Sequence, residues 1–105
     1  AYVVLGLSAD KSLNGTAPVD YAYKGIALSN TSGTLSILDG ETAIDTLVYK
    51  SGKPFPTVTQ GASFQLKKAG FTASGNDDGA AWCLSVNPFG TASLKGTPGA
   101  ANDCN

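Results

Sequence analysis

Strand-like alternation of apolar and polar residues runs through much of this chain, whereas the period of an amphipathic helix is nearly absent. Residues 2–8 (YVVLGLS) form a short continuous apolar run, which predicts a buried strand. Residues 19–30 (VDYAYKGIALSN) contain alternating strand-like residues that are broken at Gly25. Between these two segments, Asn14 and Gly15 predict a turn.

The stretch GTLSILDGETAIDTLVYK predicts a β-hairpin. Leu35 and Ile37 are two residues apart and therefore share one face of the first strand. Asp39-Gly40 is a strong hairpin-turn signal, and an apolar return strand follows from Ile44 to Tyr49.

Two further short strands are predicted in the second half of the chain. Pro54 and Pro56 cannot donate ladder hydrogen bonds, so the segment around them is a loop. Residues 62–68 (ASFQLKK) predict a strand with Phe64 and Leu66 on one side. The segment AWCLSV predicts the last strand, and an irregular tail rich in glycine and proline follows it.

These elements predict an all-β fold. About six short strands separated by turn-rich segments are typical of an antiparallel β-sandwich. The chain has 105 residues with no internal repeat and no linker, so we expect one domain over residues 1–105.

The charge content and the lengths of the apolar runs argue against a nucleic-acid partner and a membrane-spanning helix. Charged residues make up 14% of the chain, and seven basic and eight acidic residues give a net charge of −1 without any basic cluster. Binding to DNA draws on the release of counterions by a basic surface, so a nucleic-acid partner is unlikely. No apolar run approaches the roughly 20 residues of a membrane-spanning helix.

Cys83 and Cys104 are the only cysteines, and they allow a single pairing. The chain has no histidine and no further cysteine to complete a metal site, so a disulfide is the preferred interpretation. The bond would close a loop of about 22 residues, worth roughly 3 kcal/mol in the chain-entropy estimate. It would tie down the irregular tail and indicates an oxidising compartment, so we expect a secreted or cell-surface location.

Catalytic chemistry has little support in the sequence. Without histidine a Ser-His-Asp triad is excluded, and no pair of carboxylates is fixed across a cleft. Asp39 and Glu41 flank the predicted turn, where solvated acids are common. Asp45 lies within a predicted strand, which favours a structural hydrogen-bond acceptor over a catalytic acid. We therefore expect a non-enzyme without a cofactor.

The GNDDG segment is a weak calcium candidate. It places Asn76, Asp77 and Asp78 in a loop between two glycines. Calcium takes six to eight oxygen ligands, more than these side chains supply, so a solvated turn is the preferred interpretation.

The aromatic residues have alternative roles. Tyr21 and Tyr23 alternate on one strand face, where they could form a stacking platform for sugars or bases. A core or cross-strand pair explains the same spacing. Trp82 precedes Cys83 and is expected to be a core residue packed by the disulfide.

Four segments, taken in order, resemble the lamin-tail domain in its bacterial secreted form: LSNTSGTLSILDGETAIDTLVY, GASFQLKK, NDDGAAWC and GTPGAAN. The last is the most specific, with Pro98 and Gly99 following Trp82. The hairpin ends in the moderately specific pattern Asp45-x-x-x-Tyr49. The resemblance implies structural roles for these five residues, an immunoglobulin-like β-sandwich, and no catalysis. The paired cysteines around the tail look like an extracellular variant of the family.

Bacterial members of that family look like accessory modules beside secreted nucleases, phosphatases or surface domains. Nuclear relatives are associated with chromatin and scaffold proteins. The family often carries a basic residue where this chain has Leu66.

The chain also departs from the family at its beginning. The family usually opens with strands carrying a WIEL-N type motif before the segment similar to YVVLGLS, and this motif has no counterpart here. A sandwich lacking those first strands would expose sheet edges and apolar surface. We therefore expect self-association or pairing with a strand of another protein.

The leading hypothesis is a non-catalytic extracellular interaction or scaffold module. The alternative is a ligand-binding accessory domain of a secreted enzyme, with Tyr21 and Tyr23 as the candidate binding residues for carbohydrate or DNA.

Overall fold

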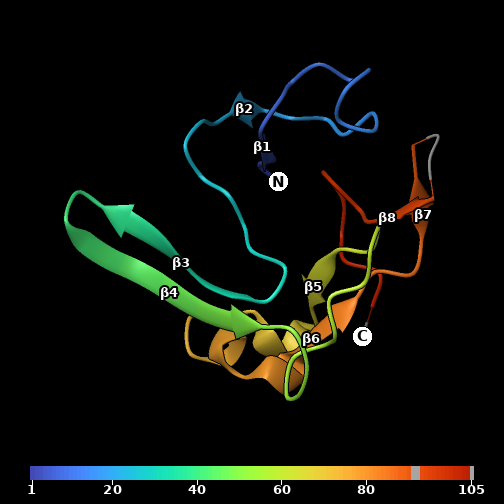
Figure 1. Cartoon of the computed structure of the whole chain (residues 1–105). Helices are drawn as coiled ribbons and strands as arrows, with labels where there is room; N and C mark the ends of the chain where they lie inside the picture. The colour runs from blue at the N-terminus through green and yellow to red at the C-terminus, as the bar shows by residue number, and fades with distance from the viewer. Residues whose placement is uncertain (91–92, 105) are drawn as a thin grey trace.

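The computed structural model describes residues 1–90 and 93–104 and consists mainly of short β-strands joined by loops (Figure 1). The strands are β1 (Leu5–Gly6), β2 (Tyr21–Ala22), β3 (Ser32–Asp39), β4 (Thr42–Lys50), β5 (Phe64–Leu66), β6 (Trp82–Leu84), β7 (Pro88–Phe89) and β8 (Leu94–Lys95). Three short 3-10 helices are η1 (Lys68–Gly70), η2 (Gly75–Asp77) and η3 (Gly79–Ala81). No segment within the described residues is an α-helix, so the β-rich prediction is confirmed.

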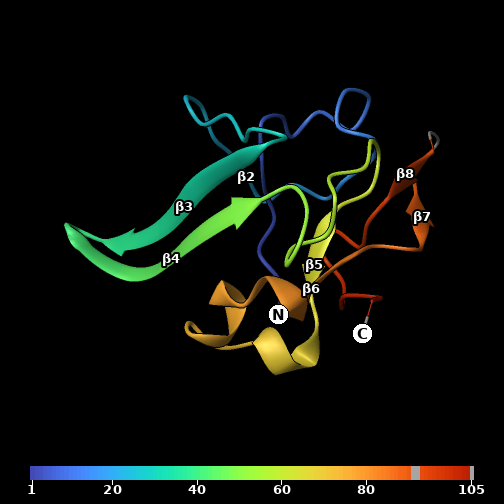
Figure 2. The ribbon, with the colours of Figure 1, turned by 60° about the horizontal axis from the view of Figure 1, so that its bottom comes forward.

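The strands pair two by two. β1 and β2 are parallel, whereas β3–β4, β5–β6 and β7–β8 are antiparallel. Each sheet within residues 1–90 and 93–104 has two strands, and a single parallel bridge between Ala62 and Lys95 links the segment before β5 to β8. The β3–β4 hairpin is the longest element, and its tip projects away from the rest of the molecule in both views (Figures 1 and 2).

The hairpin forms where the sequence predicts it. Leu35 lies opposite Leu47, and the register runs from Ser32 opposite Lys50 to Asp39 opposite Thr42. The turn is therefore one residue later than the predicted Asp39-Gly40, with Gly40 at φ 59°. A positive φ is strained for most side chains, which explains glycine at this position.

The N-terminal prediction is wrong in length and in burial. Of the run 2–8, only Leu5 and Gly6 form a strand, and Leu5 and Leu7 are 62% and 69% exposed. Only two residues of the 19–30 segment join a strand, pairing with β1. The Asp20 carboxylate accepts a hydrogen bond from the Val4 N–H at 2.8 Å. These contacts fix the backbone, but no second layer covers the apolar side chains.

A small core forms around Phe55, which is 7% exposed. The Trp82 ring packs on Phe55 at 6.3 Å and on Phe64 at 6.5 Å between ring centroids. Gly79 touches the same ring closely, since a Cβ there would lie 2.7 Å from Phe55 Cδ2. The core thus joins the proline loop, the β5–β6 pair and η3.

The predicted strands at β5 and β6 are confirmed, but the tail is less irregular than expected. It contains the short antiparallel pair β7–β8. This pairing was missed because each strand has only two residues, too few to show an alternating pattern.

Candidate functional site

The β3–β4 hairpin has two chemically different faces. Side chains alternate between the faces of a strand pair, which places Leu35, Ile37, Leu47 and Tyr49 on one side, called here the apolar face. Asp45 lies on the same side, opposite Ile37. The opposite side, called the polar face, carries Thr34, Ser36, Thr46 and Val48. Ser36 and Thr46 are joined across the strands by a 3.0 Å hydrogen bond between their hydroxyls.

A cavity of about 440 Å³ lies between the base of the apolar face and the core. Its wall is mainly apolar and includes Leu28, Leu35, Leu47, Tyr49, Phe64 and Trp82. Residues of both the β3–β4 pair and the β5–β6 pair therefore line one mainly apolar cavity.

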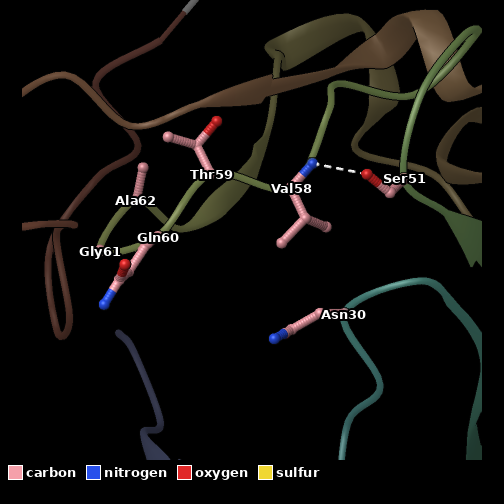
Figure 3. Close-up of a pocket in the computed structure, with 7 residues that line it drawn as sticks. All are labelled: Asn30, Ser51, Val58, Thr59, Gln60, Gly61 and Ala62. Carbon is pink, nitrogen blue, oxygen red and sulfur yellow. Dashed lines mark hydrogen bonds between the residues drawn. The ribbon is translucent and has the colours of Figure 1, made fainter.

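A more polar cavity of about 630 Å³ adjoins it and shares Asn30, Val58 and Ala62. Figure 3 shows that Thr59 and Gln60 also line this space. The Val58 N–H donates a hydrogen bond to Ser51 Oγ at 2.8 Å, which holds the loop against the end of β4.

The apolar residues become more exposed toward the turn. Leu35 is 42% exposed, whereas Ile37, Leu38 and Ile44 are 62%, 57% and 62% exposed. These last three residues are called here the hairpin tip. A register shift between Ile37 and Leu38 leaves one extra residue on β4, so the ladder is irregular there.

The backbone of β3 also has free hydrogen-bonding groups. The Ser51 N–H donates to the Thr31 carbonyl at 2.8 Å, in continuation of the β3–β4 register. Hydrogen-bonded and non-hydrogen-bonded pairs alternate in an antiparallel ladder. Thr34 and Ser36 therefore belong to non-hydrogen-bonded pairs, and their N–H and C=O groups point to the open edge.

The accessible surface of the molecule is larger than is typical for a folded monomer of its mass. Its accessible surface is 7,168 Å² for 10.6 kDa. A folded monomer of this mass typically exposes about 5,500 Å². The excess is about 1,700 Å² and is distributed over the molecule, since large apolar side chains are exposed in the N-terminal segment as well as in the hairpin.

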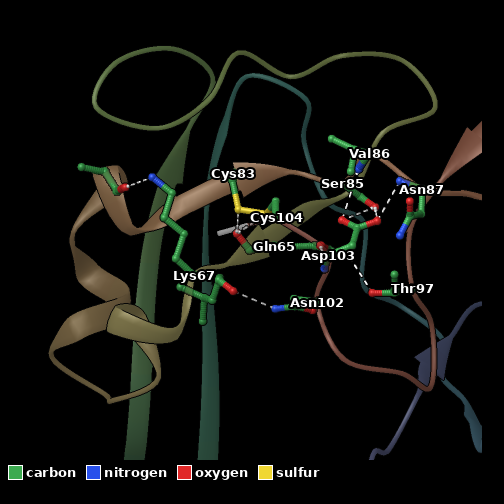
Figure 4. Close-up of a disulfide and its surroundings, with 12 residues drawn as sticks. Gln65, Lys67, Cys83, Ser85, Val86, Asn87, Thr97, Asn102, Asp103 and Cys104 are labelled. Carbon is green, nitrogen blue, oxygen red and sulfur yellow. Dashed lines mark hydrogen bonds between the residues drawn. A yellow bond between two sulfur atoms is a disulfide. The ribbon is translucent and has the colours of Figure 1, made fainter.

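The predicted disulfide is confirmed, and it fixes the tail to β6. Cys83 in β6 is bonded to Cys104, with a Cα–Cα distance of 6.0 Å (Figure 4). Gln65 adds polar support: its Nε2 donates to Thr97 Oγ1 at 2.7 Å, and its Oε1 accepts from the Asp103 N–H at 3.0 Å. Gln65 is only 6% exposed, and both bonds are partly buried.

Asp103 anchors the tail to the segment after β6. Its carboxylate accepts hydrogen bonds from the Ser85 hydroxyl at 2.9 and 3.0 Å, and from the backbone N–H groups of Val86 at 3.2 Å and Asn87 at 2.7 Å. Desolvation raises the pKa of Asp103, but the Asn87 N–H, the Ser85 hydroxyl and the Val86 N–H together lower it below the usual 3.8.

Replacement of Asp103 by asparagine is expected to change the acid side of the stability profile. Because the folded-state pKa is lowered, the carboxylate stabilises the fold above the unfolded pKa of 3.8, and this contribution is lost as the pH falls through the folded pKa. Asp103→Asn should lower the melting temperature at pH 7 and flatten its fall below about pH 4. Asp77→Asn, which removes an exposed carboxylate, is the control. Parallel profiles for wild type and Asp103→Asn would contradict this role.

The two candidate binding tyrosines differ in exposure. Tyr21 lies in β2 and is 66% exposed, whereas Tyr23 is half-buried. In the described part of the chain, both close aromatic pairs involve Trp82. Of the two candidates, Tyr21 alone offers a largely exposed ring.

The predicted structural residues of the hairpin make specific polar contacts. Asp45 is half-buried and accepts a hydrogen bond from Asn76 Nδ2. The Trp82 indole N–H donates to the Asn76 carbonyl at 2.7 Å. The Tyr49 hydroxyl donates to the Ser29 carbonyl at 2.8 Å. Trp82 is half-buried and touches core aromatic rings rather than being packed by the disulfide alone.

Pro98 and Gly99 lie in the tail loop. Pro98 lines a shallow cavity with Gln65 and Phe89. Gly99 has φ +78°, and a Cβ there would lie 3.1 Å from Pro18 Cγ. Glycine at this position therefore serves the backbone turn and the contact with the N-terminal segment.

The calcium candidates have separate contacts. Asn76 is turned to Asp45, and Asp78 Oδ1 accepts from the Ala80 N–H at 2.9 Å at the start of η3. Asp77 is exposed. Among residues 1–90 and 93–104, no group of three or more His, Cys, Asp or Glu side chains is arranged to hold a metal ion.

Sequence reasoning missed Gln65 and the open edge of β3. A single glutamine between Phe64 and Leu66 has the pattern of an outward residue on an amphipathic strand. The uncharged run SGTLSIL was a usable signal for the edge, since natural edge strands commonly carry charge or proline.

None of the helices in residues 1–90 and 93–104 is long and apolar enough to cross a membrane. Comparisons with protein-family models, with curated proteins and with solved structures found no match to this chain.

Proposed function

We propose that this chain is a non-catalytic interaction module that binds another polypeptide through the β3–β4 hairpin. The observation that carries this proposal is the combination of an open strand edge with an exposed apolar tip on one projecting element. Main-chain groups of an open edge supply affinity for an extended segment, and alternate side chains supply specificity. The Cys83–Cys104 bond supports action in an oxidising compartment, outside the cell or at its surface.

The same surface is compatible with an immunoglobulin-like sandwich of the lamin-tail type. The β3–β4 and β5–β6 pairs both border one apolar cavity, as two facing sheets of a sandwich would. We propose that a docked strand extends the β3–β4 sheet and covers the hairpin tip.

The role of a carbohydrate- or DNA-binding accessory domain receives less support. It depends on Tyr21 and Tyr23, of which only Tyr21 is largely exposed. The net charge of −1 gives weak attraction to DNA.

Hairpin binding can be tested with an immobilised synthetic peptide of alternating threonine and valine, measured by interferometry. We expect the wild type to bind and Ile37→Lys to weaken the binding at least about tenfold, because a charge would enter the apolar contact. Val48→Lys is the matched control: Val48 is 65% exposed against 62% for Ile37, but it lies on the polar face.

Two results would contradict the proposal. The first is absence of peptide binding by the folded wild type at a concentration where it is monomeric, and the second is an equal effect of the two lysine substitutions. Retention on an insoluble polysaccharide that is lost with Tyr21→Ala would instead favour the accessory role.

A further inference from the structure

We infer that the polypeptide bound by the hairpin is a second copy of this chain, paired antiparallel along the open edge of β3. The inference rests on the proposed function, because it assumes that the hairpin is the docking element. It adds the identity of the partner, the edge that is used and the register of the pairing.

The two edges of the hairpin differ in their protection against pairing. From Ser32 to Leu38, β3 contains no charged residue and no proline. The β4 strand carries Asp45 and Lys50 and contains the extra residue of the bulge. Charges and bulges are the usual devices that prevent edge pairing, so β3 is the available edge.

The β3 edge is self-complementary. The outward-pointing backbone groups belong to Thr34 and Ser36, which are placed symmetrically about Leu35. A two-fold axis at Leu35 therefore sets Thr34 opposite the second copy's Ser36, and their backbone groups can bond in both directions.

Side chains fit the same register. In this register Leu35 lies opposite Leu35 of the second copy, and Ile37 lies opposite the second copy's Gly33. These non-hydrogen-bonded pairs bring side chains close together. The Tyr49 ring lies over Gly33, since a Cβ there would be 2.7 Å from the Tyr49 hydroxyl oxygen, so Ile37 would meet this ring. Leu35, Ile37 and Gly33 lie on the apolar face, so the pairing continues that face across four strands.

The net charge of the chain is compatible with pairing of two copies. A net charge of −1 gives little repulsion between copies. A two-fold contact uses the same edge on both chains, so the assembly closes at the dimer.

The edge can be tested by sedimentation equilibrium of the full chain. We expect the wild type to have twice the 10.6 kDa chain mass at micromolar concentration. Ser36→Pro removes an outward-pointing N–H from both copies and should weaken dimerisation at least about 100-fold. Thr46→Pro is matched, because it loses the same 3.0 Å hydroxyl contact and an outward N–H, but on the β4 edge. That variant should stay dimeric.

The register can be tested with charges at the axis. Leu35→Lys and Leu35→Glu should each be monomeric, because identical charges would face each other across the axis. An equimolar mixture should recover the dimer mass, since lysine then faces glutamate. Circular dichroism of each variant, compared with wild type, reports whether the strands are kept.

The outcomes separate this inference from the proposed function. A monomeric wild type that still binds the threonine–valine peptide would overturn the self-pairing and keep the interaction role. A dimer that is lost with Thr46→Pro and kept with Ser36→Pro would overturn the choice of edge. Two folded charge variants that fail to combine would overturn the register, and open-ended filaments would overturn the two-fold geometry.

Discussion

Replacement of Phe55 by alanine is expected to lower the free energy of unfolding by about 3–5 kcal/mol, the usual cost of removing a buried phenylalanine side chain. Phe55 is 7% exposed and is the one large side chain among the buried apolar residues of the described chain. Its ring touches Trp82 and lies against Gly79, so its loss would leave a cavity between the proline loop and η3.

The small size of the core makes this substitution severe. Domains of this kind are typically stable by about 5–15 kcal/mol, so the loss approaches the whole stability at the lower limit. Little other apolar burial can compensate, because many large apolar side chains of the molecule are exposed.

The effect of Phe55→Ala can be measured by urea unfolding with Trp82, the single tryptophan, as the fluorescent probe. Phe71→Ala is the matched control, because Phe71 is 60% exposed and its truncation should change stability by less than about 1 kcal/mol. Equal losses in the two variants would show that the ring of Phe55 does not carry the core.

Removal of the disulfide by the double substitution Cys83→Ser and Cys104→Ser should lower the free energy of unfolding by about 3 kcal/mol. The bond joins residues 21 positions apart and restricts the unfolded chain. The bonded Cys104 is 8% exposed and is one of the few buried apolar residues of the described chain.

The tail should loosen first in the serine variant. Hydrogen exchange is expected to increase at the Asp103 amide, which bonds Gln65, more than at the amides of the β3–β4 ladder. A change in unfolding free energy below about 1 kcal/mol, with unchanged exchange in the tail, would show that Gln65 and Asp103 hold this segment without the covalent bond.

The hairpin was predictable because its sequence signal is local. The disulfide was predictable because two cysteines allow only one pairing. Alternating residues on both sides of Asp39-Gly40 specify a hairpin without reference to the rest of the chain. Two cysteines without a metal-binding companion allow a single pairing. Asp45 was predicted to accept a hydrogen bond within its strand, and Asn76 Nδ2 donates one to it.

Other features depend on contacts between distant segments. The run 2–8 is apolar enough for a buried strand, yet Leu5 and Leu7 are exposed because no layer packs on them. Gln65 is buried because the tail, 32 to 38 residues later, supplies its hydrogen-bond partners. The open edge of β3 likewise reflects which strands pair and which do not. Hydrophobic pattern sets what a segment can bury, whereas burial itself requires a partner surface, and long-range packing alone brings that surface into place.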